Sequence, residues 1–101
     1  MKALTILNSP DEIKIRDKAK YKYINNIIEI EVWPTVVTLH IYDNKTLLAK
    51  LRYYNDDQVE QRDKTIIYLD DDFLFLYEVQ IINQIAGYFI PPIKKYFKNN
   101  D

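Results

Sequence analysis

Basic residues occupy every second position of one segment near the N-terminus, and this alternation constrains the fold more than any other feature. The basic row consists of Lys14, Arg16, Lys18, Lys20 and Lys22. The positions between them are apolar except for Asp17. A period of two is typical of a β-strand with one face in solvent and the other in the core. The row therefore predicts such a strand, whose basic face either binds an anionic partner or is neutralised by its neighbours.

A tight turn is predicted at Asn25-Asn26, because asparagine tolerates positive φ better than most residues. Placing Ile24 opposite Ile27 brings apolar residues together on one face of the resulting hairpin. On the other face this register predicts two pairs of opposite charge, Lys22 with Glu29 and Lys20 with Glu31. Such pairs across neighbouring strands are favourable by about 0.2–1 kcal/mol.

The next two strands extend the same apolar face. Pro34-Thr35 connects to a strand over Val36–Tyr42, and a three-residue loop at Asp43–Lys45 predicts pairing of Ile41 with Leu47. The result is a four-stranded antiparallel meander from Ile13 to Tyr54, with Lys2–Leu7 as a fifth strand.

The C-terminal half leaves more than one interpretation open. The polar segment Asn55–Lys64 is a loop or a short surface helix, and Thr65–Leu69 is a further strand. A helix then begins at Asp71 or Asp72 as N-cap and ends at Gly87 as the C′ residue. The alternative is a hairpin in which Phe73–Val79 is a strand, since this segment is rich in aromatic residues.

Two adjacent prolines, Pro91-Pro92, are expected to stop that helix, and Ile93–Lys98 then forms one terminal helical turn. The fold class is α+β: one domain over residues 1–101, in which an antiparallel meander of four to five strands is packed on one face by a C-terminal helix. The predicted sheet core is Tyr21, Ile28, Ile30, Val32, Val37, Leu39, Ile41, Leu47, Ala49 and Leu51. The helix residues expected to cover it are Leu74, Tyr77, Ile81 and Ile85.

Composition excludes several classes of function. The chain has no cysteine, so disulfides, thiol catalysis and thiolate zinc sites are excluded. Gly87 is the only glycine, which excludes the glycine-rich loops that cradle phosphates. No apolar run approaches the ~20 residues that span a bilayer. We therefore expect a cytoplasmic protein with no membrane contact, no cofactor, no metal site and no evident small-molecule substrate.

The outward face of the meander is the candidate binding surface. The residues predicted to bind a partner are Arg16, Lys18, Trp33, His40, Tyr42, Arg52 and Tyr54. Aromatic side chains among cations are how sheet surfaces bind single-stranded nucleic acid, which is one alternative for this face. The other interpretation is that Glu29 and Glu31 neutralise the lysines and that Trp33 lies in an interface.

Catalytic constellations are weak in this sequence. The acidic residues Asp56, Asp57, Glu60 and Asp63, with Asp70–Asp72, allow a metal-dependent nuclease as an alternative, but their spacing is not specific for a metal site, and loop solvation and helix capping explain them better. His40 is the only histidine, and the sequence gives no sign of a serine or aspartate partner for acid–base catalysis. We therefore predict no catalytic residues and no enzymatic activity.

The composition as a whole, with nine tyrosines, one glycine, no cysteine and abundant isoleucine, lysine and asparagine, resembles small orphan proteins of viruses and mobile elements with AT-rich genomes, such as filamentous archaeal viruses. The resemblance implies an accessory factor in the host cell. Together with the surplus of aromatic residues, it predicts a non-enzymatic protein that binds another macromolecule, as a homodimer.

Overall fold

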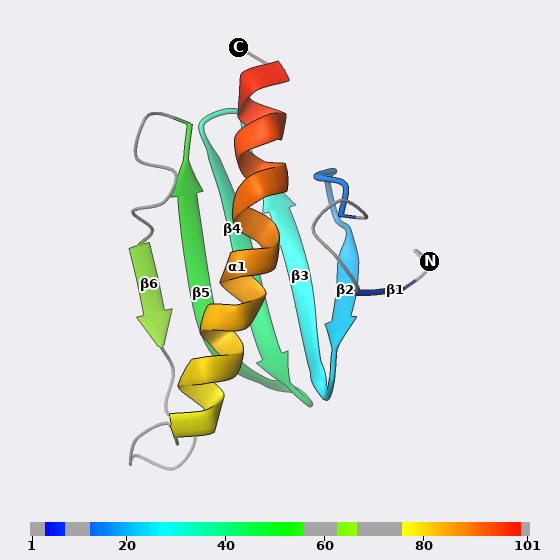
Figure 1. Ribbon diagram of the computed structural model, residues 1–101, viewed down its shortest axis with the longest axis vertical. Coiled ribbons are helices and arrows are strands. Elements are labelled where there is room, and N and C mark those ends of the chain that lie inside the picture. The colour runs from blue at the N-terminus through cyan, green and yellow to red at the C-terminus, as the bar shows by residue number, and fades with distance from the viewer. Residues whose placement is uncertain (1–3, 8–12, 56–62, 67–75, 100–101) are drawn as a thin grey trace.

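Over residues 4–7, 13–55, 63–66 and 76–99, which the structure describes, the computed structural model shows a six-stranded sheet with a long helix on one face (Figure 1). Its elements are β1 (Thr5–Ile6), β2 (Lys20–Tyr23), β3 (Asn26–Val32), β4 (Val36–Asp43), β5 (Thr46–Tyr54), β6 (Asp63–Ile66) and α1 (Leu76–Asn99). The strands lie in sequence order, and β2 to β6 are antiparallel neighbours. The predicted α+β class is confirmed. The fifth strand predicted over Lys2–Leu7 is present as β1, and it pairs parallel with β2.

Except at Leu47 and Leu48 of β5, alternation along the strands sorts the residues onto the two faces as predicted. The buried sheet residues on the helix side are Tyr21, Ile28, Ile30, Val37, Leu39, Ile41, Ala49, Leu51 and Tyr53. Val32 and Leu47, also predicted in the core, are only half-buried. Each fully buried aliphatic side chain contributes about 1.5–3 kcal/mol, so this face dominates the stability of the domain.

The basic row does not form one continuous strand. Residues Ile13–Arg16 have no regular structure, a turn follows at Asp17-Lys18, and β2 begins only at Lys20. Lys18 has a φ of 60°, in the left-handed region. A strand from Ile13 is therefore wrong, although Ile13 and Ala19 are buried as their apolar character predicts.

The turn between β2 and β3 lies one residue earlier than predicted, and the pairing of the two strands is shifted by two residues. Tyr23 pairs with Asn26, so Ile24 and Asn25 form the turn and Ile24 has a φ of 54°. A shift of two residues keeps every side chain on its face, so alternation cannot distinguish the two registers. Asn26 is buried in β3, where its Nδ2 donates to the carbonyl of Tyr42 at 3.2 Å.

The hairpin between β4 and β5 contains a β-bulge, and its pairing differs from the prediction. The loop has two residues, Asn44-Lys45, in place of the predicted three, and Ile41 pairs with Ala49 where Leu47 was expected. Leu48 is the extra residue on β5 and is buried, although the sequence placed it outward. Because the bulge adds one residue to β5, Ala49 and Leu51 still face the core although the loop has only two residues.

The helix continues past both of its predicted stop signals. It passes through Gly87 and contains Pro91 and Pro92. Its buried residues follow a spacing of about four: Ile82, Ile85, Ala86, Phe89, Ile93 and Phe97. A proline inside a helix costs about 3 kcal/mol, and the burial of Ile93 and Phe97 beyond the prolines offsets that cost.

Other predictions for the C-terminal half have mixed outcomes. Residues 76–79 are helical, which contradicts the strand alternative for that part of Phe73–Val79. Several predictions concern parts of the chain outside the described residues. These are the proposed N-caps, the side chains of Leu74 and Tyr77, and residues 56–62. Strand β6 overlaps the strand predicted at Thr65–Leu69.

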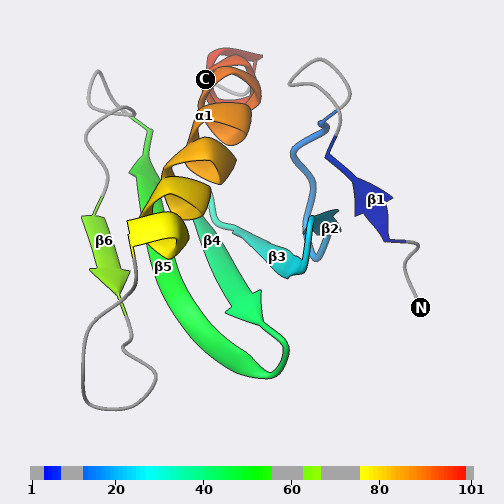
Figure 2. The same ribbon diagram turned by 60° about the horizontal axis from the view of Figure 1, so that its bottom comes forward.

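Two tyrosines of β2 join the sheet to α1. The ring of Tyr21 packs edge-on against the ring of Phe89, with 5.2 Å between the ring centroids. The Tyr23 hydroxyl donates to Oε1 of Gln84 at 2.7 Å. Figure 2 shows that the helix crosses one face of the sheet, while β1 and β6 form its two edges. Among the described residues, no helix covers the opposite face, which we call the open face.

Candidate binding surface on the open face of the sheet

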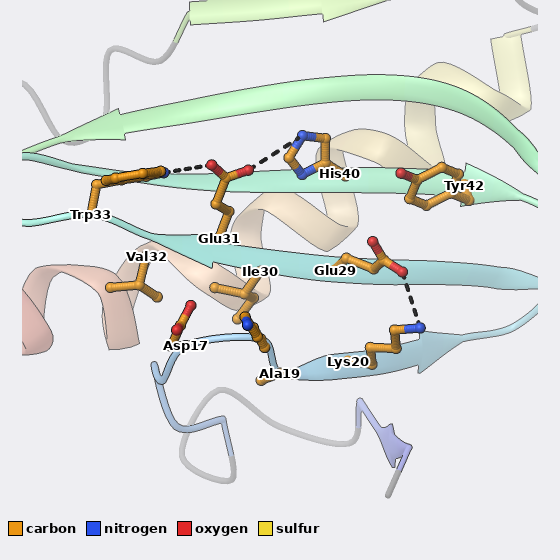
Figure 3. Close-up of a pocket in the computed structure, with 11 residues that line it drawn as sticks. Asp17, Ala19, Lys20, Glu29, Ile30, Glu31, Val32, Trp33, His40 and Tyr42 are labelled. Atoms are coloured by element: carbon orange, nitrogen blue, oxygen red, sulfur yellow. Dashed lines mark hydrogen bonds and ion pairs between the residues drawn. The ribbon is translucent and has the colours of Figure 1, made fainter. Parts of the chain in front are cut away.

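The open face carries a hollow of about 760 Å³, which we call the Trp33 hollow (Figure 3). The polar and aromatic residues that line it are Asp17, Lys18, Lys20, Glu29, Glu31, Trp33, His40 and Tyr42. They come from the turn before β2, from β2, β3 and β4, and, for Trp33, from the connection between β3 and β4. Because these strands are neighbours, alternation along each of them brings these side chains to one surface.

Trp33 is the largest exposed residue of this surface, with 54% of its area accessible. It begins the tight turn from β3 to β4, where its N–H donates to the carbonyl of Val36 at 2.8 Å. Its indole Nε1 donates to Oε1 of Glu31 at 2.5 Å. Glu31 and Trp33 are two positions apart in the chain, and this spacing places both on the same face. The ring is therefore fixed by a charge-assisted hydrogen bond while it remains open to solvent.

His40 lies next to the same carboxylate. Its Nε2 is 4.0 Å from Oε2 of Glu31, and its side chain is 17% exposed. Its partners across the sheet are Glu29 on β3 and Lys50 on β5. Glu31 thus contacts both Trp33 and His40, and Figure 3 shows Glu31 between them.

The ion pair on this face differs from the predicted pairs. Lys20 Nζ lies 3.1 Å from Oε1 of Glu29, whereas the sequence predicted Glu31 opposite Lys20 and Glu29 opposite Lys22. The two-residue change of register is the cause. Glu29 still neutralises a lysine of the basic row, but Glu31 becomes available to Trp33 and His40.

The structure brings four of the seven predicted partner-binding residues together. Lys18, Trp33, His40 and Tyr42 all line the Trp33 hollow. Arg52 lines a smaller hollow of about 410 Å³ with Lys50, and Trp33 belongs to both hollows. Arg16 and Tyr54 are exposed but are not among the described residues that line either one. Whether any of the seven binds a partner stays a prediction.

Sequence reasoning treated Glu29 and Glu31 only as charges that neutralise lysines. The structure shows that Glu31 also orients Trp33. The signal was available in the sequence: a carboxylate two positions before an exposed tryptophan in a strand lies beside it.

The described residues offer no grouped set of ligands for a metal ion. In that part of the chain, no three His, Asp or Glu side chains are grouped as a metal site requires. Most of the acidic residues proposed for a nuclease lie outside the described ranges, including Asp56, Asp57, Glu60 and Asp70–Asp72, and the side chain of Asp63 does too.

Among the residues that the structure describes, no helix is both long and apolar enough to cross a membrane.

Comparisons with known proteins found no family model, no curated protein and no solved structure that matches this chain. Any function must therefore be argued from the surface itself.

Proposed function

We propose that this chain is a non-enzymatic interaction protein that binds another protein through the open face of its sheet, centred on Trp33. The observation that carries the proposal is a tryptophan, Trp33, that is 54% exposed, with its indole hydrogen-bonded to Glu31, beside a hollow of about 760 Å³. Tryptophan is strongly enriched among the residues that dominate binding energy at interfaces. An anchor that is already oriented also loses less conformational freedom on binding.

A protein partner agrees with the charges of the surface better than a nucleic acid does. Glu29 and Glu31 lie in the hollow, and the ammonium of Lys20 is paired with Glu29. The phosphate groups of a nucleic acid bound along this face would lie close to those carboxylates and be repelled by them. Binding of nucleic acid is the alternative, and the nuclease treatment in the following experiment would detect it.

The test is site-specific photocross-linking in a lysate of the native host. Benzoylphenylalanine replaces Tyr42, which lines the hollow, or Lys95, which is exposed on α1. We expect a defined cross-linked protein from position 42 that resists nuclease and is lost when Trp33→Ala is added. Equal products from both positions, no product, or a product removed by nuclease would each contradict the proposal.

A homodimer is a second candidate, favoured by apolar residues near the β1 edge. Leu4 is 44% exposed, Ile6 is 62% exposed, and Ile24 in the adjacent turn is 58% exposed. Edge strands with exposed apolar side chains can pair with another chain. Sedimentation velocity should show a dimer that dissociates in Ile6→Lys or Ile24→Asn, where asparagine suits the φ of 54°. A wild-type monomer at high concentration would remove this candidate.

The compositional resemblance to viral and mobile-element proteins extends the proposal to an accessory factor that acts in the cytoplasm of a host cell. Such a factor needs a recognition surface and no catalytic site, which is the arrangement proposed for the open face.

A further inference from the structure

We propose that the Trp33 hollow takes a cationic side chain of the partner, with arginine as the best fit. This inference deepens the proposed function and rests on it, because it names the chemistry that the open face recognises. Three sets of observations carry it: the charge of the hollow, the geometry of Trp33 and Glu31, and the separate location of the remaining basic residues.

The charge of the hollow favours a cation. Three carboxylates line it, those of Asp17, Glu29 and Glu31, against the two ammonium groups of Lys18 and Lys20. The Lys20 ammonium lies 3.1 Å from Glu29, so those two charges largely cancel. Glu31 is the carboxylate next to the exposed indole, and its side chain is itself 48% exposed. A ligand that reaches Trp33 therefore meets a negative charge.

Trp33 and Glu31 together match a guanidinium group. A carboxylate has about four lone-pair sites, so Glu31 can accept further hydrogen bonds in addition to the one from the indole. A planar guanidinium can stack on the face of Trp33 and donate to Glu31 at the same time. Figure 3 shows Tyr42 beyond His40, at the opposite end of this row from Trp33, where a second aromatic ring borders the hollow.

The basic residues of the open face that suit an anion lie elsewhere. Lys50 and Arg52 line the smaller hollow, on which Trp33 and Glu31 also border. An anionic ligand in the smaller hollow would be repelled by the Glu31 carboxylate, whereas a cationic ligand in the Trp33 hollow is attracted by it. The two possibilities therefore respond in opposite directions to removal of the Glu31 charge, and they can be separated by experiment.

Trp33 is the only tryptophan, so fluorescence excited selectively at tryptophan, where the nine tyrosines do not absorb, reports on the surroundings of Trp33. The protein is titrated at low salt with a capped tetra-arginine peptide, a capped tetra-glutamate peptide and a short oligothymidylate. We expect a saturable change with tetra-arginine and none with the two anionic probes.

Two matched variants test the role of Glu31. Glu31→Gln keeps an oxygen that can accept the hydrogen bond from Trp33 but removes the charge, and we expect tetra-arginine to bind about tenfold more weakly. Asp43→Asn removes the same charge from the end of β4, outside the described lining of the hollow, and should leave the affinity unchanged. Circular dichroism confirms that both variants are folded.

Three results would overturn the inference: no saturable change with tetra-arginine, equal weakening in both variants, or binding of oligothymidylate in its place. Its failure is distinguishable from failure of the proposed function. A Trp33-dependent protein cross-link at position 42 without tetra-arginine binding contradicts only the cationic ligand, whereas loss of the cross-link as well contradicts both.

Discussion

The two faces of the sheet are built from the same strands, yet they differ in what fixes their residues. On the helix side, Val37, Leu39 and Ile41 of β4 have no exposed area. On the open face of the same strand, His40 and Tyr42 are half-buried and line a hollow. Packing determines which residues can occupy the face covered by the helix, because any loss of side-chain volume there leaves a cavity. The open face carries polar contacts that contribute little to folding, and its residues are therefore available for binding.

The largest difference between the faces should appear when a charge is introduced. Leu39→Asp places a carboxylate at a position with no exposed area, and the cost of about 5 kcal/mol or more is comparable to the whole stability of a small domain. We expect this variant to be unfolded by circular dichroism. Its control is Lys50→Ala on the open face, which should retain the wild-type melting temperature. Folded Leu39→Asp protein would show that the covered face is assigned incorrectly.

Tyr21 tests the covered face through pH. Burial raises the pKa of its hydroxyl, which donates to the carbonyl of Lys14 at 2.7 Å. The folded state therefore holds this proton more tightly than the unfolded state, whose tyrosines titrate near a pKa of about 10. The stability that Tyr21 contributes is complete below that pH and is lost as the pH rises above it.

Replacing the tyrosine isolates this contribution. At pH 7, Tyr21→Phe should reduce the free energy of unfolding by about 1 kcal/mol, the value of one hydrogen bond. In urea titrations at pH 11 the difference between variant and wild type should be smaller. An equal difference at both pH values would show that the Tyr21 hydroxyl does not titrate differently in the folded protein.

Gly87 distinguishes a continuous helix from one that ends there. A Cβ built at Gly87 meets no atom within 4 Å, and the residue is exposed within α1 without a positive φ. Gly87→Ala should therefore raise the free energy of unfolding by about 0.5–1 kcal/mol. A loss of stability would instead support the C′ role that the sequence suggested, because alanine is strained at positive φ.

The smallest effect is expected for the ion pair of the open face. Lys20 and Glu29 have side chains that are 52% and 40% exposed, and such pairs contribute about 0–1 kcal/mol. Lys20→Ala should change the urea midpoint by no more than the experimental error. A large loss would mean that polar contacts on this face also support the fold, and the contrast between the faces would weaken.

The faces of the strands could be predicted from the sequence, but their registers could not. Burying Tyr21, Ile28 and Leu39 on one side follows from alternation alone. A shift of two residues at the first hairpin leaves that alternation unchanged, and the bulge at Leu48 interrupts it only within β5. Only tertiary contacts, such as the hydrogen bond from Asn26 to the Tyr42 carbonyl, distinguish the registers.

The helix and the site were misjudged for related reasons. Local stop signals at Gly87 and Pro91 are weaker than the burial of Ile93 and Phe97, which depends on a sheet that local propensity does not consider. In the same way, the role of Glu31 depended on the register. The wrong register paired it with Lys20, whereas the structure leaves it beside Trp33 and His40.

Trp33→Ala tests the central claim most directly, because it asks whether the open face binds without supporting the fold. The measurement is the yield of the partner cross-linked from position 42, at equal protein concentration and with the urea midpoint as a check on folding. We expect the yield to be lost while the free energy of unfolding changes by less than about 1 kcal/mol, as for other exposed residues. An unchanged yield, or a loss of stability comparable to that of a core substitution, would contradict the division between a folding face and a binding face.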